Sequence, residues 1–148
     1  MEIAGQQQFN APRDVVWKIL LDPGALKGCI PGCEEFTEVA TQSYKLVVRV
    51  GISAIKGSYD GTVKVADITA PDSYRLIVNG RGKPGSVQGD ARMTLSDAAG
   101  GTLVSYTGEV KAQGAISRLG SRLLGGAAKL MIGQFFKAME NQVAQRTV

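Results

Sequence analysis

The chain has 148 residues, of which 44% are hydrophobic and 20% charged, and its formal net charge is +4. This length and composition predict one globular domain over residues 1–148, large enough to bury a core of its own. The sequence contains no histidine. Any site that it forms therefore lacks the commonest general acid-base group and the commonest metal ligand.

The N-terminal part predicts one strand followed by two helices. Residues 2–9 read as the strand, and Pro12 suits the first turn of a helix capped by Asn10 or the alanine after it. The Asp-Pro-Gly sequence at 22–24 ends this helix, and a short second helix follows at 25–27. The N-terminus of the chain has neither the basic start nor the apolar centre of a signal peptide, so we expect a cytoplasmic protein.

Apolar and polar residues alternate from residue 35 to residue 113. This period of two predicts half-buried antiparallel strands joined by short turns. Six strands are expected, at residues 36–40, 45–52, 58–65, 74–80, 87–95 and 104–112. Asp60, Asp90 and Glu109 fall on the outward phase, which leaves no evident pair of carboxylates for acid-base catalysis.

Four glycines fall on the inward, apolar phase of these strands: Gly61, Gly80, Gly89 and Gly108. Glycine inside a strand marks a sharp bend or a close backbone approach. A bent sheet with small inward residues predicts either an internal apolar cavity or a bend whose concave side is filled by a helix.

Residues 115–147 predict one long helix. Its expected core face consists of Ile116, Leu119, Leu123, Leu124, Ala127, Leu130, Met131 and Ala138. A second apolar stripe, Ile132, Phe136, Met139 and Val143, is expected well round from that face, either exposed as a docking surface or partly covered by the first helix. From residue 115 onward five basic residues stand against one acid, Glu140. This excess predicts contact with an anionic membrane or an acidic partner, or simply a solvated helix face.

Strand, two helices, six strands and a long C-terminal helix is the element order of the START-like helix-grip fold. In this α+β fold a bent antiparallel sheet of about seven strands wraps around the last helix. The segments FNAPRDVVWKILLDPGALKGCIPGCEEF, IKGSYDGTVKVADI and LGSRLLGGAAKLMIGQFF resemble the G-subunit family of carbon monoxide dehydrogenase. The resemblance runs over essentially the whole chain.

The resemblance implies a non-catalytic accessory protein. Members of that family are credited with recruiting a molybdenum hydroxylase of the carbon monoxide dehydrogenase type to the inner face of the cytoplasmic membrane. They are also credited with binding a quinone-like lipid. The resemblance therefore implies peripheral membrane contact, and a bound lipid or quinone as ligand with no catalytic cofactor. Two alternatives remain open: a cyclase- or aromatase-like enzyme of the same fold, and a structural adaptor with a filled core. The bases are not interleaved with exposed aromatic residues, so nucleic acid is not expected as a partner.

The expected ligand cavity lies between the sheet and the long helix. Its candidate lining residues are Tyr59, Gly61, Tyr74, Val78, Gly80, Gly89, Ala91, Tyr106, Gly108, Leu123, Ala127, Leu130, Met131 and Gln134. Gln134 falls within the apolar helix face, where its amide needs a hydrogen-bond partner. That partner is either a backbone group or water, or a carbonyl of the ligand.

Two further groups of residues are candidates for the ends of the domain. The loop residues Cys29, Ile30, Pro31, Gly32 and Cys33 are expected to form a turn that packs near one end of the cavity. Two cysteines without histidine are too few for a structural zinc site, and we expect both to be reduced and metal-free in the cell. An exposed hairpin tip with Ile52, Ile55 and Lys56 is the expected membrane or partner contact.

Overall fold

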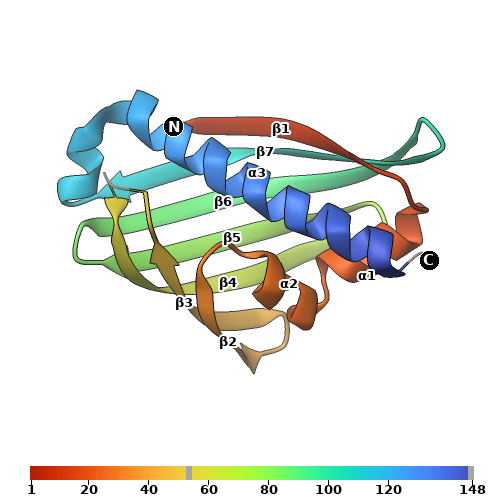
Figure 1. The fold of residues 1–148 in the computed structure, drawn as a ribbon, viewed down its shortest axis with the longest axis horizontal. Coiled ribbons are helices and arrows are strands. Elements are labelled where there is room, and N and C mark those ends of the chain that lie inside the picture. The colour runs from red at the N-terminus through yellow and green to blue at the C-terminus, as the bar shows by residue number, and fades with distance from the viewer. Residues whose placement is uncertain (53–54, 147–148) are drawn as a thin grey trace.

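The computed structural model describes residues 1–52 and 55–146 as one seven-stranded antiparallel sheet with a long helix across one face (Figure 1). The strands lie in the order β1-β7-β6-β5-β4-β3-β2. The elements are β1 (Glu2–Phe9), α1 (Arg13–Leu20), α2 (Pro23–Cys29), β2 (Cys33–Ala40), β3 (Ser43–Val50), β4 (Gly57–Thr69), β5 (Ser73–Gly82), β6 (Gly85–Ala98), β7 (Gly101–Gln113), the 3-10 helix η2 (Ala115–Leu119) and α3 (Gly120–Arg146). This is the predicted α+β helix-grip fold.

The strand register separates the sheet into two faces. Tyr74, Met93 and Tyr106 are direct neighbours across β5, β6 and β7, and all three pack on the side that α3 covers. We call this side the inner face. The next residue along a strand points the other way, so Asp90 and Glu109, which are paired in register, lie together on the outer face, as predicted.

The apolar core consists of two separate clusters. The larger cluster joins α1, α2 and the last turns of α3 to the inner face, with Phe9, Trp17 and Met139 among its members. The smaller cluster lies at the other end of α3, where Ile116 of η2 packs with Tyr59 of β4. Because the core is divided into two clusters, the middle of the inner face belongs to neither of them.

The N-terminal helices begin differently from the prediction. Pro12 itself occupies the N-cap of α1, and its carbonyl accepts hydrogen bonds from the Val15 and Val16 amides, both at 3.1 Å. Asp22 caps α2 by accepting a hydrogen bond from the Gly24 amide at 3.1 Å. The Asp-Pro-Gly sequence therefore starts the second helix as well as ending the first, because proline fits the first turn.

The expected core face of the C-terminal helix is wrong in both halves of α3. In the first half Leu123 and Leu130 of that face are exposed, and in the second half Phe136, Met139 and Val143 of the other stripe are buried. Figure 1 shows α3 crossing the strands at an angle, so the side of the helix that meets the sheet changes along its length. The stripe that contains Phe136 packs in the larger cluster, where the Phe136 ring stacks on that of Tyr106 with ring centroids 5.6 Å apart.

The C-terminal helical segment is also interrupted. Residues 115–119 form the 3-10 helix η2, and Gly120 has φ +83°, a backbone conformation that glycine adopts without strain. The α-helix starts only at Gly120. The change of direction at this glycine lets η2 pack into the smaller cluster while α3 runs back across the sheet.

Candidate ligand-binding site

The middle of the inner face is not filled by either core cluster. Along β6, Val87 packs on the smaller cluster and Met93 belongs to the larger one, while Gly89 and Ala91 lie between them. On β5, Val78 is the register partner of Gly89 and also belongs to neither cluster. We call Val78, Gly80, Gly89 and Ala91 the open strip.

Solvent reaches the open strip even though it faces α3. Val78 keeps 36% of its surface exposed, although its register partner Val63 on β4 is buried. A side-chain carbon placed on Gly80 would meet no other atom within 4 Å, so space lies directly above this residue. An exposed apolar surface between two packed clusters is the feature that a hydrophobic ligand can cover.

The four inward glycines meet two different structural requirements. A side chain on Gly61 would collide with the backbone of Asn79, and one on Gly108 would collide with the backbone of Asp90 and Ala91. These two glycines allow close approach of neighbouring strands. Gly80 and Gly89 are not crowded in this way, so their missing side chains leave the strip open.

The helix side of the predicted cavity is only partly right. Ala127 and Met131 are half-buried and pack against the smaller cluster, on which Val87 at the end of the open strip also packs. Leu123, Leu130 and Gln134 are exposed instead of facing the sheet. The proposed role of Gln134 inside a cavity is therefore wrong, because the helix is rotated relative to the expected core face.

The three candidate tyrosines lie on the inner face but belong to its packed ends. Tyr59 donates a 2.6 Å hydrogen bond to the Ile55 carbonyl within the smaller cluster. Tyr74 packs edge-on against Trp17, with centroids 5.4 Å apart, and burial raises the pKa of its hydroxyl. Tyr106 packs on the larger cluster. The tyrosines thus border the open strip rather than line it.

The cysteine loop has the predicted shape. Gly32 has φ +71°, and a side chain there would collide with the Arg49 carbonyl, so the turn requires glycine. The Arg49 amide donates a 2.9 Å hydrogen bond to the Gly32 carbonyl, which ties the turn to β3. Cys29 is only 3% exposed, and Ile30 packs on the same larger cluster.

Both cysteines are free thiols in this structure. Cys33 is partly exposed, and its thiol donates a 3.3 Å hydrogen bond to the Glu35 carbonyl. Burial raises the pKa of both thiols above its ordinary value. Such thiols are poor nucleophiles and poor metal ligands, which is consistent with a structural role.

The prediction of an exposed tip between β3 and β4 is wrong for Ile55, its main residue. Ile55 is only 8% exposed and is a member of the smaller cluster, and Ile52 packs against that cluster. Lys56 is exposed. Residues 53–54, at the centre of the expected turn, lie outside the described residues. Ile55 lies inward with its carbonyl accepting the hydrogen bond from the Tyr59 hydroxyl.

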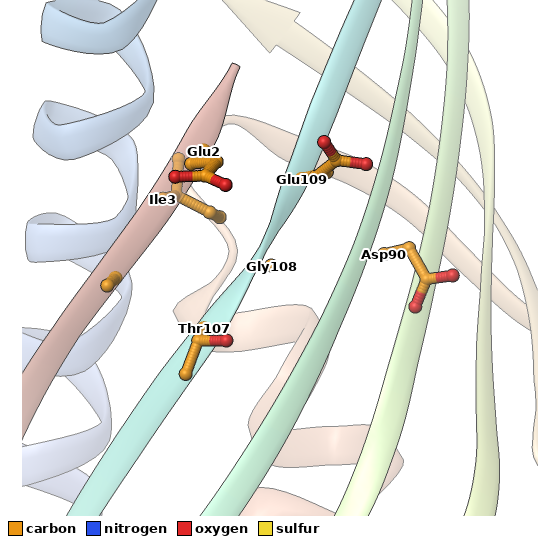
Figure 2. A pocket seen from close by; sticks show the side chains of 7 residues that line it. Glu2, Ile3, Asp90, Thr107, Gly108 and Glu109 are labelled. Carbon is orange, nitrogen blue, oxygen red and sulfur yellow. The ribbon is translucent and has the colours of Figure 1, made fainter.

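Two hollows on the outer face were not anticipated from the sequence. The first has a volume of about 460 Å³, and Figure 2 shows Glu2, Asp90 and Glu109 around it. Glu109 is the register partner of both Glu2 and Asp90, and Arg75 donates hydrogen bonds to Asp90. Alternation in the sequence places Asp90 and Glu109 outward, but only the register shows that Glu2 lies in the same row.

The second hollow has a volume of about 330 Å³. Its lining residues are Lys45, Asp60, Gly61, Thr62, Asn79, Gly80, Arg81, Ser86, Val87, Gln88 and Gln113. Neither hollow is the apolar cavity expected beneath α3, where the structure has the open strip instead. Among the described residues no group of three or more Cys, Asp or Glu side chains is placed to hold a metal ion. None of the described helices is long and apolar enough to cross a membrane.

Comparisons with known proteins identify the family. A crystal structure of a conserved protein from Geobacillus kaustophilus is 35% identical, with a TM-score of 0.95 over 98% of this chain and 96% of that one. A START superfamily protein from Mycobacterium smegmatis is 14% identical, with a TM-score of 0.77 over 97% of each chain, which supports the fold alone. A comparison with curated proteins found no match. The sequence profile of the carbon monoxide dehydrogenase G-subunit family (CoxG) matches residues 5–144, so the chain belongs to that family.

Proposed function

We propose that this protein binds a lipid- or quinone-like molecule along the open strip and acts as a non-catalytic accessory protein. The observation that carries the proposal is the exposure of Val78 on the inner face, between two packed clusters. Covering apolar surface stabilises a complex by roughly 25 cal/mol per Å². A molecule that lies between α3 and β5–β6 would bring the two clusters into one continuous apolar core.

The chemistry of the strip favours binding over catalysis. Its four residues, Val78, Gly80, Gly89 and Ala91, include no ionisable group. The carboxylates of Asp60, Asp90 and Glu109 are exposed on the outer face, away from this strip. A flat apolar ring system fits such a surface better than a substrate that needs proton transfer.

Family membership supports the wider role. The family is that of a subunit of carbon monoxide dehydrogenase, and we propose that the partner of this protein is a molybdenum hydroxylase of that type. In this proposal the apolar ligand and a peripheral contact with the cytoplasmic membrane bring the hydroxylase to the inner membrane surface.

The test compares two aspartate substitutions at neighbouring positions of β5. Val78→Asp places a charge on the open strip, whereas Asn79→Asp places the same charge on the outer face, where Asn79 is already exposed. The probe is menadione, a naphthoquinone, and binding is measured by fluorescence titration and by native mass spectrometry. We expect Val78→Asp to weaken binding at least tenfold, because a charge must be desolvated, and Asn79→Asp to bind like the parent protein.

Native mass spectrometry of freshly purified protein, followed by lipid extraction, provides an independent readout. A stoichiometric apolar molecule that is absent from Val78→Asp supports the proposal. If neither protein carries a molecule and neither binds menadione, an accessory role without a ligand, such as that of a structural adaptor, replaces it. Turnover of a bound molecule would favour an enzyme of the same fold.

A further inference from the structure

One flank of α3 carries two exposed leucines. Leu123 is 47% exposed and Leu130 is 50% exposed, which places both among the most exposed large apolar residues in the described chain. They are seven residues apart and so lie on nearly the same side of the helix, about 10 Å apart along its axis. We call the exposed residues Arg122, Leu123, Gly126, Lys129, Leu130, Gly133 and Lys137 the basic flank of α3.

The fold itself does not need these leucines. The second half of α3 is held by Phe136, Met139 and Val143, and the first half by Leu124, Ala127 and Met131. Neither Leu123 nor Leu130 belongs to a core cluster. Between them the flank has Gly126, which leaves the two leucine side chains standing above their surroundings. Their exposure is therefore a property of the surface and is not explained by packing.

The charge around the leucines has one sign. Arg122, Lys129 and Lys137 are exposed, and within the described residues none of them forms an ion pair. Glu140 is the only acidic residue of α3, and it accepts a 3.3 Å hydrogen bond from the Gln7 side chain of β1. Apolar side chains ringed by unpaired bases complement a surface that is anionic outside and apolar just beneath.

We propose that the basic flank of α3 docks on an anionic lipid bilayer, with the helix lying in the plane of the membrane surface. This rests on the proposed function for its purpose, but the surface is argued from exposure and charge alone. Each basic residue near an anionic bilayer strengthens binding about fivefold, and leucines enter the boundary between headgroups and acyl chains. A fluid bilayer is favoured over a protein because the flank is convex and has no aromatic anchor.

The orientation has two consequences. The hollow formed by Glu2, Asp90 and Glu109 lies on the outer face of the sheet, so these carboxylates point away from the anionic headgroups. Ala127 lies one helical turn from both Leu123 and Leu130 and packs on the smaller cluster. The proposed bilayer contact and the smaller cluster therefore lie within one turn of each other on α3.

Vesicle co-sedimentation tests the docking surface. Vesicles of phosphatidylcholine, with and without phosphatidylglycerol, are mixed with the parent protein and three variants. The Leu123→Ser/Leu130→Ser variant should lose at least tenfold in binding to anionic vesicles. The Arg122→Gln/Lys129→Gln variant should lose about 25-fold on anionic vesicles, by loss of two charges. The control, Val39→Ser/Ile68→Ser, removes two exposed apolar residues from β2 and β4 and should bind like the parent.

Two accompanying measurements separate this inference from the proposed function. Thermal unfolding should be nearly the same in all variants, because the replaced side chains are exposed. Menadione binding without vesicles should be unchanged in the leucine variant. If the parent binds menadione but no vesicles, or if the variants sediment like the parent, the docking surface is wrong while the ligand site stands. Binding of the flank to purified hydroxylase without any vesicle binding would likewise overturn the bilayer proposal.

Discussion

Gly61 and Gly80 face each other across β4 and β5, but only Gly80 has room for a side chain. A Cβ on Gly61 would lie 2.5 Å from the Asn79 carbonyl oxygen, whereas a Cβ on Gly80 would meet nothing within 4 Å. The first glycine therefore permits the strands to approach, and the second keeps the open strip empty. The same residue type in register has a structural role on one strand and a proposed binding role on the other.

Substitution of the two glycines should have opposite effects on stability. Gly80→Val should leave the free energy of unfolding unchanged or raise it by about 0.5–1 kcal/mol, because glycine is unfavourable inside a strand. Gly61→Ala should lower it by about 1–3 kcal/mol, because the methyl group forces the backbone apart. Urea unfolding measures both. Gly80→Val should also weaken menadione binding, so a stable variant that binds like the parent would argue against the strip.

The hydrogen bond from Tyr59 to the Ile55 carbonyl predicts a measurable contribution to stability. Tyr59→Phe should lower the free energy of unfolding by about 1–2 kcal/mol, because a buried carbonyl loses its donor. Tyr106→Phe is the matched control, since within the described residues the Tyr106 hydroxyl has no hydrogen-bond partner. Equal losses in both variants would mean that the Tyr59 hydroxyl does not hold the connection between β3 and β4.

The contact between α2 and the end of α3 should depend on pH. The Arg146 guanidinium donates a 2.6 Å hydrogen bond to Asp22, which lowers the pKa of that carboxyl below its usual value. A carboxyl with a lowered folded-state pKa stabilises the protein above its unfolded pKa of about 4, and this contribution is lost as the pH falls through the folded pKa. Both side chains are partly exposed, so the pair contributes at most about 1 kcal/mol.

Two substitutions of Asp22 separate the charge from the helix cap. Asp22→Asn keeps an oxygen that can accept from Gly24 but loses the ion pair, so its deficit relative to the parent should be present near neutral pH and shrink in acid. Asp22→Ala also removes the cap and should lose about 1 kcal/mol more. Urea unfolding over a pH series gives both differences. A deficit of Asp22→Asn that stays constant down to strongly acid pH would exclude the ion pair as its cause.

The two thiols should differ in their rate of reaction. Burial raises the pKa of both, so the thiolate fraction is small near neutral pH and grows as the pH rises. Ellman's reagent should modify the partly exposed Cys33 slowly and the buried Cys29 only on unfolding. Cys33→Ser should remove the faster phase. Fewer than two titratable thiols in freshly prepared, unfolded protein would show that the cysteines are not both reduced.

The strands of the sheet could be predicted from the sequence because the alternation of apolar and polar residues is a local pattern. The alternation around Asp60, Asp90 and Glu109 places each carboxylate on the outer face, and this holds in the structure. The turn at Gly32 could be predicted too, since Pro-Gly between apolar residues leaves few backbone conformations. What alternation does not contain is register, so the row formed by Glu2, Glu109 and Asp90 is visible only in the folded sheet.

The helix side of the site could not be predicted because it depends on tertiary packing. A helical wheel assumes one buried face along the whole length, but α3 buries Leu124 and Met131 against one cluster and Phe136 and Met139 against the other. That assumption wrongly places Gln134 and Leu130 on the buried side, whereas both are exposed. Ile55 was expected to be exposed at a tip, but it lies inward with its carbonyl accepting a hydrogen bond from the Tyr59 hydroxyl.

Methyl NMR of the protein during titration with menadione tests the ligand site most directly. Methyl groups of Val78, Ala91, Ala127 and Met131 report on the open strip and its helix side, and those of Val16 and Val104 report on the closed larger cluster. A ligand on the open strip should produce saturable shifts of the first group with little change in the second. Shifts confined to Ala4 and Thr107 at the outer hollow, or no shifts at any of these positions, would contradict it.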